Sequence, residues 1–336
     1  MAQATKHCSS RLSGNKRKLH AAMADNMLAS AKRVWQQAAS DFDPSLAEVD
    51  GIEMYEPESS NMLLSLKRIS NWLDHAITKF GACAAVADAN DVKGLEPVAA
   101  EVVKAFVAAI GTMISLRRGA GPTLCMELHT IGNELATTIE QLGASVGTAS
   151  MALAAGKALD RAQRLEHLSI SNRFAIAKRL DAIRTQLCNC HDELTDALTP
   201  ADIDDEQDNE DSLEEFDCDC SLDADERSVA MATDVAVDLF KNLLDAIMRS
   251  HDCGNSQGEV DLVRIDCGEV VVSRCAVAVD SIDGLVAHVL GGLNRKEFLQ
   301  SLAEFQQSLV ELGRRGLDTQ KLQESVLGVH SALANV

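Results

Sequence analysis

Apolar residues recur along this chain at alternating steps of four and three, and this spacing constrains the fold more than any other feature. Two stretches show it most clearly: Leu124, Leu128, Ile131, Leu135, Thr138 and Leu142, and then Ile176, Leu180, Ile183, Leu187, Cys190 and Leu194. Such steps place the side chains on one face of an α-helix. Similar faces occur within residues 66–80, 98–116, 229–247 and 299–312. The sequence therefore predicts an all-α fold class.

Length and composition indicate how these helices are grouped. A chain of 336 residues exceeds what one hydrophobic core usually serves, and several amphipathic helices most simply form antiparallel bundles. We expect an N-terminal extension with one helix (1–59), an N-terminal helical bundle (60–198), an acidic linker (199–222) and a C-terminal helical bundle (223–336). The aromatic content of only 3% also favours helix over sheet.

The linker is predicted from its charge. The net charge of the chain is −20, and residues 202–226 contain fourteen acidic residues and no Lys or Arg. An EF-hand loop beginning at Asp202 would need Gly and Glu where Gln207 and Leu213 stand, so the pattern does not predict a calcium site. Without a basic stripe, direct binding of nucleic acid is not expected. Six carboxylates are candidates for electrostatic contact with a basic partner: Asp204, Asp205, Glu206, Asp208, Glu210 and Asp211.

Helix boundaries are indicated at several places, and one segment stays open. Asn294 and Glu297 form a capping-box pattern, Asp318 is placed to cap the last helix, and Gly143 is placed to end the helix before it. Residues 259–279 are rich in β-branched side chains, so they form either a helix or a pair of strands. The helical neighbours of this segment favour helix, because an isolated hairpin would need a sheet to join.

No motif predicts an enzyme, a cofactor or a metal. Gly143-Ala-Ser145-Val-Gly147 matches a nucleophile elbow, but that motif needs a preceding strand, and a helical pattern precedes it here. Cys188, Cys190 and His191 could join Cys218 and Cys220 in a zinc site, but the first two cysteines lie within a helical pattern and point in different directions. The expectation is no catalytic, cofactor-binding or metal-binding residue.

The sequence also bears on location. It contains no run of about 18 apolar residues and no secretory signal, and ten cysteines are too few for a disulfide scaffold. We therefore expect no membrane span and a cytoplasmic and nuclear location. The first 40 residues hold seven Lys/Arg and one acid, so a transit peptide stays an alternative for this region.

One short motif carries a family resemblance. The box Gly119-Ala-Gly121-Pro122-Thr123-Leu124, which opens a long amphipathic helix, resembles the Gly-x-Gly-Pro-Thr-Leu box of the cyclin-D-binding protein family. These proteins are also called cyclin-D-interacting helix-loop-helix proteins, and the plant-type members are most similar. The resemblance covers about residues 60–335.

The resemblance implies a fold and a function. The fold would be similar to the helical bundles of vinculin and talin. The function would be non-enzymatic: binding a D-type cyclin or a helix-loop-helix factor, with negative regulation of cell-cycle progression and transcription. The alternative is a vinculin/talin-like structural adaptor for cytoskeletal or trafficking partners. The family supplies no catalytic residue to assign to this sequence.

Overall fold

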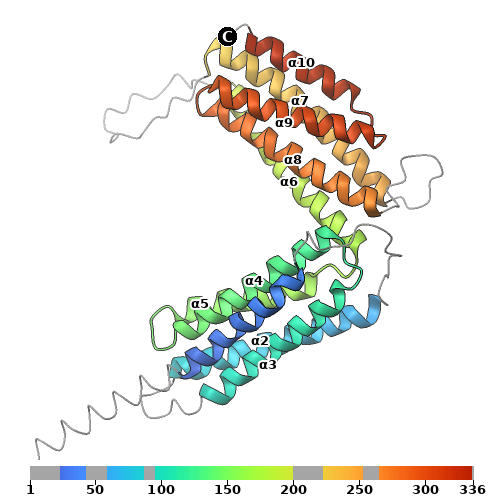
Figure 1. Cartoon of the computed structure of the whole chain (residues 1–336). Coiled ribbons are helices and arrows are strands. Elements are labelled where there is room, and N and C mark those ends of the chain that lie inside the picture. The colour runs from blue at the N-terminus through green and yellow to red at the C-terminus, as the bar shows by residue number, and fades with distance from the viewer. Residues whose placement is uncertain (1–22, 43–58, 87–94, 200–221, 253–264, 335–336) are drawn as a thin grey trace, which may run out of the picture. The chain divides into compact units, whose positions relative to one another are not determined.

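The computed structural model describes residues 23–42, 59–86, 95–199, 222–252 and 265–334, and all regular structure within these ranges is helical. The prediction of an all-α fold is therefore confirmed. The chain forms two compact units, Met1–Ala175 (unit 1) and Ile176–Val336 (unit 2), each with its own hydrophobic core (Figure 1).

The described residues of unit 1 form five helices of 13 residues or more. A helix at residues 23–39 ends in the 3₁₀ turn η1 (Ser40–Phe42) and is followed by α2 (Ser59–Val86), α3 (Leu95–Arg117), α4 (Pro122–Ala144), α5 (Met151–Gln163) and the 3₁₀ turn η4 (Arg164–His167). Their apolar faces meet in a core with the aromatic side chains of Trp35, Phe42, Phe80 and Phe106 at its centre. A buried hydrogen bond from Ser70 Oγ to the Ala162 carbonyl (3.0 Å) joins α2 to α5.

The predicted N-terminal helix is confirmed, and it is an integral part of unit 1. Trp35 is 2% exposed and stacks on Phe42, with 5.4 Å between the ring centroids. Its indole ring lies so close to Gly132 of α4 that a Cβ at this position would overlap it. The ammonium of Lys32 also pairs with Glu140 of α4 at 2.6 Å. This helix therefore completes the core instead of extending from it.

Helix α3 is the most apolar element of unit 1. Among the described residues, α3 is the one helix that is both long enough and apolar enough to cross a membrane, judged by length and composition alone. Ten of its residues are buried in the structure, among them Val102, Phe106 and Met113. Packing within unit 1 thus accounts for much of its apolar composition.

Unit 2 contains most of α6 (Asn172–Leu198) together with α7 (Ala224–Asp252), α8 (Ile265–Leu290), α9 (Arg295–Arg314) and α10 (Gln320–Ala334). Its core includes Phe240 and Phe305, whose rings meet edge to face at 5.6 Å. The Arg184 guanidinium of α6 donates to Asp245 of α7 at 2.7 Å, and this carboxylate raises the pKa of the arginine.

The division between the units differs from the predicted limits. The sequence placed residues 60–198 in one bundle and began the next at 223, whereas the structure divides the chain between Ala175 and Ile176, within α6. The apolar face of α6 from Ile176 to Leu194 packs in the core of unit 2. The reason is that the spacing of apolar residues shows which face of a helix is buried, not which neighbour covers it.

The structure shows the conformation of most of residues 259–279, for which the sequence allowed either a helix or a pair of strands. From Ile265 onward it is the first half of α8, and Val271, Val272 and Val279 are buried in the core of unit 2. Helix is therefore confirmed for residues 265–279, and residues 259–264 lie outside the described residues. Packing outweighs the modest β preference of these side chains.

The caps predicted for unit 2 are present. The Asn294 side chain accepts a hydrogen bond from the Glu297 amide at the start of α9, and the Asp318 carboxylate accepts from the Gln320 amide at the start of α10. A further capping box, not predicted from the sequence, opens α7. There, Asp223 accepts from the Glu226 amide (2.7 Å), and Glu226 accepts from the Asp223 amide (3.2 Å).

The predicted end of α4 at Gly143 is wrong by two positions. The helix continues to Ala144 and its C-cap is Ser145. Gly143 is instead a crossing point, because a Cβ there would lie 3.0 Å from Leu28 Cβ and 3.3 Å from Asp25 Cα in the helix at residues 23–39. A long-range packing requirement thus resembled a local stop signal.

Candidate functional site

The family-motif box Gly119–Leu124 forms the connection between α3 and α4. Gly119 has φ = 83°, a conformation that favours glycine, and the Ala120 amide donates to the Arg117 carbonyl at 2.9 Å to close the turn. Gly121 is the N-cap of α4, and Pro122 occupies the first helical turn, where its missing N–H costs nothing. The box therefore reverses the chain and starts the helix.

Asn172, at the start of α6, holds this connection in place. Its side-chain oxygen accepts from the Gly121 amide at 2.6 Å, and its side-chain nitrogen donates to the Gly119 carbonyl at 2.8 Å. Asn172 is only 8% exposed and Leu124 only 2%. Thr123 and Pro122 are half-buried. The box is consequently a positioning element, and its buried residues offer little surface to a partner.

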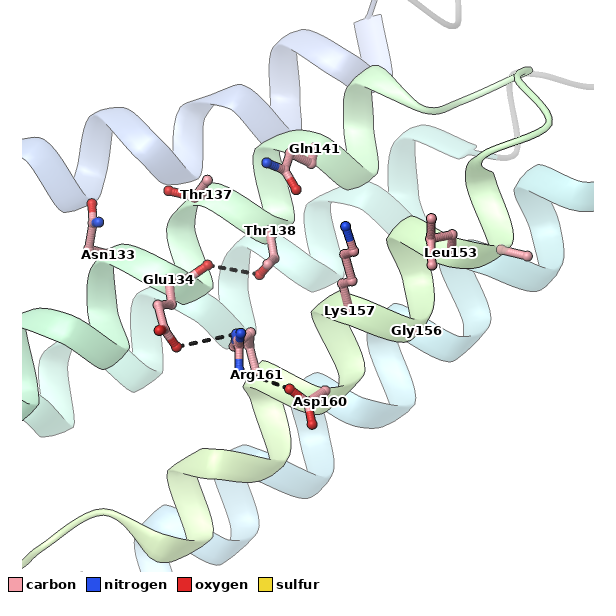
Figure 2. A pocket seen from close by; sticks show the side chains of 11 residues that line it. Asn133, Glu134, Thr137, Thr138, Gln141, Leu153, Gly156, Lys157, Asp160 and Arg161 are labelled. Atoms are coloured by element: carbon pink, nitrogen blue, oxygen red, sulfur yellow. Dashed lines mark hydrogen bonds and ion pairs between the residues drawn. The ribbon is translucent and has the colours of Figure 1, made fainter. Parts of the chain in front are cut away.

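An open groove of about 660 Å³ runs between α4 and α5 (Figure 2). On the α4 side, three polar residues follow one another at steps of four: Asn133, Thr137 and Gln141. On the α5 side lie small and apolar residues, with Lys157 between the two helices. Because the groove faces solvent and is lined by both polar and apolar side chains, it is a candidate binding site in the described part of the chain.

The α5 wall of the groove leaves room for a side chain from another molecule. Leu153 is 64% exposed, the highest value among the large hydrophobic residues of the described ranges. Ala152 is exposed as well. A Cβ placed on Gly156 would meet no atom within 4 Å. An apolar side chain of a partner could therefore cover Leu153 here without displacing any atoms of the groove.

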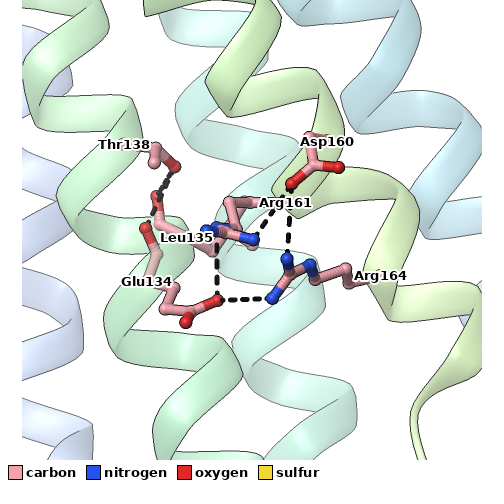
Figure 3. A network of polar contacts seen from close by, with 6 residues as sticks. All are labelled: Glu134, Leu135, Thr138, Asp160, Arg161 and Arg164. Atoms are coloured by element: carbon pink, nitrogen blue, oxygen red, sulfur yellow. Dashed lines mark hydrogen bonds and ion pairs between the residues drawn. The ribbon is translucent and has the colours of Figure 1, made fainter. Parts of the chain in front are cut away.

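Glu134, Asp160 and Arg161, which line the groove, belong to a network of ion pairs (Figure 3). Glu134 of α4 pairs with Arg161 at 3.2 Å and with Arg164 at 3.3 Å, and Asp160 pairs with the same two arginines at 3.0 and 3.6 Å. Two acids and two bases thus balance. Lys157 takes no part in this network, so its ammonium supplies net positive charge at the groove.

Ser145, the centre of the elbow-like motif, lies at the C-terminus of α4, so a helix occupies the place where the motif needs a strand. The residue is 6% exposed, and its hydroxyl donates to the Leu142 carbonyl at 2.8 Å. The Ser145 hydroxyl is therefore engaged in ending α4.

Cys188, Cys190 and His191 follow one another on α6, and the last two meet acids from different helices. Cys190 Sγ donates to Asp283 of α8 at 3.4 Å, and His191 Nε2 lies 3.5 Å from Asp234 of α7. Burial and the Asp283 carboxylate raise the pKa of the Cys190 thiol to about 12, so it stays protonated at neutral pH. Within the described ranges, no group of three or more His, Cys, Asp and Glu side chains could hold a metal ion. Cys218 and Cys220 lie outside them.

The six predicted linker contacts, Asp204, Asp205, Glu206, Asp208, Glu210 and Asp211, also lie outside the described residues. Their predicted role stays a prediction. The groove, in turn, was not identified from the sequence. The polar residues on its α4 side recur at every fourth position, which is visible in the sequence. No local feature of the sequence shows that α5 packs beside them.

Comparison with known proteins gives no relative: no family model matches the chain, and no curated protein matches it significantly. The resemblance to the cyclin-D-binding family thus stays a hypothesis based on one six-residue box and the order of elements.

Proposed function

We propose that this protein is a non-enzymatic interaction protein that binds a segment of a protein partner in the α4/α5 groove. In line with the family resemblance, the partner is a D-type cyclin or a helix-loop-helix factor. Binding would restrain cell-cycle progression or transcription in the cytoplasm and nucleus. The observation that carries the proposal is the groove itself, in which Leu153 stands 64% exposed beside open space at Gly156.

The chemistry of the groove supports a peptide or helix as its occupant. An apolar side chain of the partner would cover Leu153, and a carboxylate next to it would pair with Lys157. The amides of Asn133 and Gln141 and the hydroxyl of Thr137 would accept or donate hydrogen bonds along the opposite wall. Amphipathic helices commonly bind grooves of this kind through apolar anchors at helical spacing.

The binding test uses the purified full chain, a purified D-type cyclin and a purified helix-loop-helix factor, with association measured by a surface-based optical method. Leu153→Asp should weaken binding by about tenfold or more, because it replaces the apolar anchor with a charge that the partner must desolvate. Leu327→Asp is the matched control, since Leu327 in α10 is 58% exposed but lies in unit 2. This control should bind like the unmodified protein.

Two outcomes would count against the proposal. If neither partner binds the unmodified chain, the proposed function is wrong. If Leu153→Asp and Leu327→Asp weaken binding equally, the groove is not the contact surface. Co-sedimentation of the chain with actin filaments, without binding of either partner, would favour the structural adaptor.

The acidic segment supplies a separate, kinetic prediction. Replacing its six carboxylates at positions 204, 205, 206, 208, 210 and 211 with Asn or Gln should slow association with a basic partner and flatten the dependence on salt, while dissociation changes little. Charges that steer an encounter act mainly on the association rate. Association that keeps its rate and its response to salt would show that these carboxylates do not steer the partner.

A further inference from the structure

A second surface of unit 1, on α2, combines exposed apolar and basic residues. Two rows of exposed side chains run along the helix at steps of four: Leu64, Arg68 and Trp72 in one row, and Lys67, Asn71 and His75 in the other. Residues three and four apart are neighbours on a helix, so these six residues form one continuous surface, here called the α2 face. Leu64 is 49% exposed and Trp72 is 39% exposed.

The α2 face is positively charged and contains no acid. Within the described residues, neither Lys67 nor Arg68 forms an ion pair. Asp74, three residues after Asn71 on the same helix, accepts a hydrogen bond from Gln163 at 3.2 Å, and Glu101 of α3 pairs with Lys79 at 3.0 Å. The two free cations therefore face solvent beside two large apolar side chains.

We propose that the α2 face is a second binding surface, whose occupant is an acidic amphipathic helix of a partner protein. Carboxylates of that helix would pair with Lys67 and Arg68, while its Leu or Phe side chains would cover Leu64 and Trp72. Charge complementarity identifies the occupant, because in a protein with a net charge of −20 the residues of this face include two exposed cations, Lys67 and Arg68, and no acid. It would also repel the basic partner expected to approach the acidic segment. The proposal goes beyond the groove and stands independently of the proposed function.

Tryptophan fluorescence gives a direct readout of this surface. The chain contains two tryptophans, and Trp35 is 2% exposed in the core, whereas Trp72 belongs to the α2 face. A ligand that covers Trp72 removes water from its indole, so the emission should shift to shorter wavelength. Trp35 is already buried and should contribute a constant background. In Trp72→Phe the shift should disappear while an apolar aromatic side chain stays in place.

The probe is a synthetic helical peptide with Leu and Phe on one side and Glu and Ala elsewhere, labelled for anisotropy and titrated into the full chain. Two companion peptides replace either Leu and Phe with Ser, or Glu with Lys. We expect the first peptide to bind and shift the Trp72 emission, and both companions to bind at least about tenfold more weakly. Raising the salt concentration should weaken binding of the first peptide, because Lys67 and Arg68 are exposed.

The matched variants carry two adjacent charge reversals each. Lys67→Glu with Arg68→Glu should weaken binding by about tenfold or more, whereas Arg314→Glu with Arg315→Glu, an exposed pair in unit 2, should not change it. All four residues are exposed, so circular dichroism should show both variants folded. Leu64→Ser is a second test that leaves the charges intact, and it should also weaken binding.

Three results would overturn the proposal: no binding of the acidic amphipathic peptide, equal binding of the peptide without Leu and Phe, or equal loss in both double variants. A fourth concerns this chain itself, because residues 43–58 contain six acids and no Lys or Arg. If a peptide of that sequence binds the α2 face more tightly than the probe, the occupant is the chain's own segment and no partner is needed. Loss of peptide binding in Leu153→Asp but not in the Lys67→Glu, Arg68→Glu variant would likewise overturn the proposal, because the peptide would then occupy the groove.

Discussion

The two units solve the same problem, starting and joining helices, by different means. In unit 2, α7, α9 and α10 begin with side chains that cap their own first turn: Asp223 with Glu226, Asn294, and Asp318. In unit 1, α4 and α5 have no side-chain cap at their N-cap residues, and the start of α4 depends on Asn172, 51 residues from Gly121. Local side chains thus define the starts of these three helices in unit 2, whereas a contact distant in sequence holds the start of α4 in unit 1.

The close helix crossings differ in a similar way. In unit 1, Gly132 lies against the rigid indole of Trp35. In unit 2, Gly284 lies against the Ser301 hydroxyl, which can rotate away. Unit 1 should therefore tolerate less change at its crossings. Both tryptophans lie in unit 1, so tryptophan fluorescence follows its unfolding, while circular dichroism follows both units.

The largest effect is expected at Gly132. Gly132→Ala should lower the free energy of unfolding of unit 1 by about 3 kcal/mol, because the new methyl group overlaps the Trp35 ring and forces the N-terminal helix to shift. The measurement is urea unfolding followed by tryptophan fluorescence. Gly111→Ala in α3 is the control: its Cβ would meet no atom within 4 Å, so the higher helix propensity of Ala should stabilise unit 1 by about 0.5–1 kcal/mol. Similar effects of the two substitutions would refute the close crossing.

The next largest effect is expected at Asn172, whose side chain bonds both Gly119 and Gly121. Asn172→Ala should destabilise unit 1 by about 1–3 kcal/mol, because the buried Gly121 amide and Gly119 carbonyl lose their partner. Asn294→Ala in unit 2 removes only a local cap and should cost about 1 kcal/mol. Chemical unfolding measured by fluorescence for the first variant and by circular dichroism for the second gives the comparison. A larger loss for Asn294→Ala would reverse the contrast between the units.

The stabilities of the two units should also respond differently to alkaline pH. Burial raises the pKa of the Cys275 thiol in unit 2 to about 12, against about 9 in an unfolded chain. The folded state thus holds the proton more tightly, so this contribution is complete below pH 9 and is lost as the pH rises toward 12. The loss should approach about 1.4 kcal/mol for each pH unit. Urea unfolding by circular dichroism at pH 8 and pH 10 measures it, and Cys275→Ala should reduce the difference. A stability of unit 2 that stays constant over this range would contradict the buried thiol.

The smallest effect is expected from the ion pairs at the groove. Glu134→Gln removes the pairs with Arg161 and Arg164, but these side chains are partly exposed, so the loss should stay below about 1 kcal/mol and shrink in high salt. Fluorescence-monitored unfolding of unit 1 checks it. A loss above 2 kcal/mol would mean that the network stabilises the α4–α5 contact far more than exposed pairs usually do.

The sequence by itself determined the helical fold and much of its local detail. Steps of three and four identified the buried faces of α4 and α6, and the caps at Asn294 and Asp318 were visible because capping depends on residues close in sequence. The same locality explains the error at Gly143, where a glycine required by Leu28 and Asp25 resembled a helix stop.

Only the tertiary structure decided how those helices are combined. It packed the N-terminal helix against Gly132, assigned the face of α6 from Ile176 onward to unit 2, brought Asn172 to the Gly119–Leu124 box, and placed α5 beside α4 to form the groove. Apolar helical faces resemble one another in sequence, so a periodic pattern shows that a face is buried without showing its partner. That choice depends on the shapes of surfaces that meet only when the chain folds.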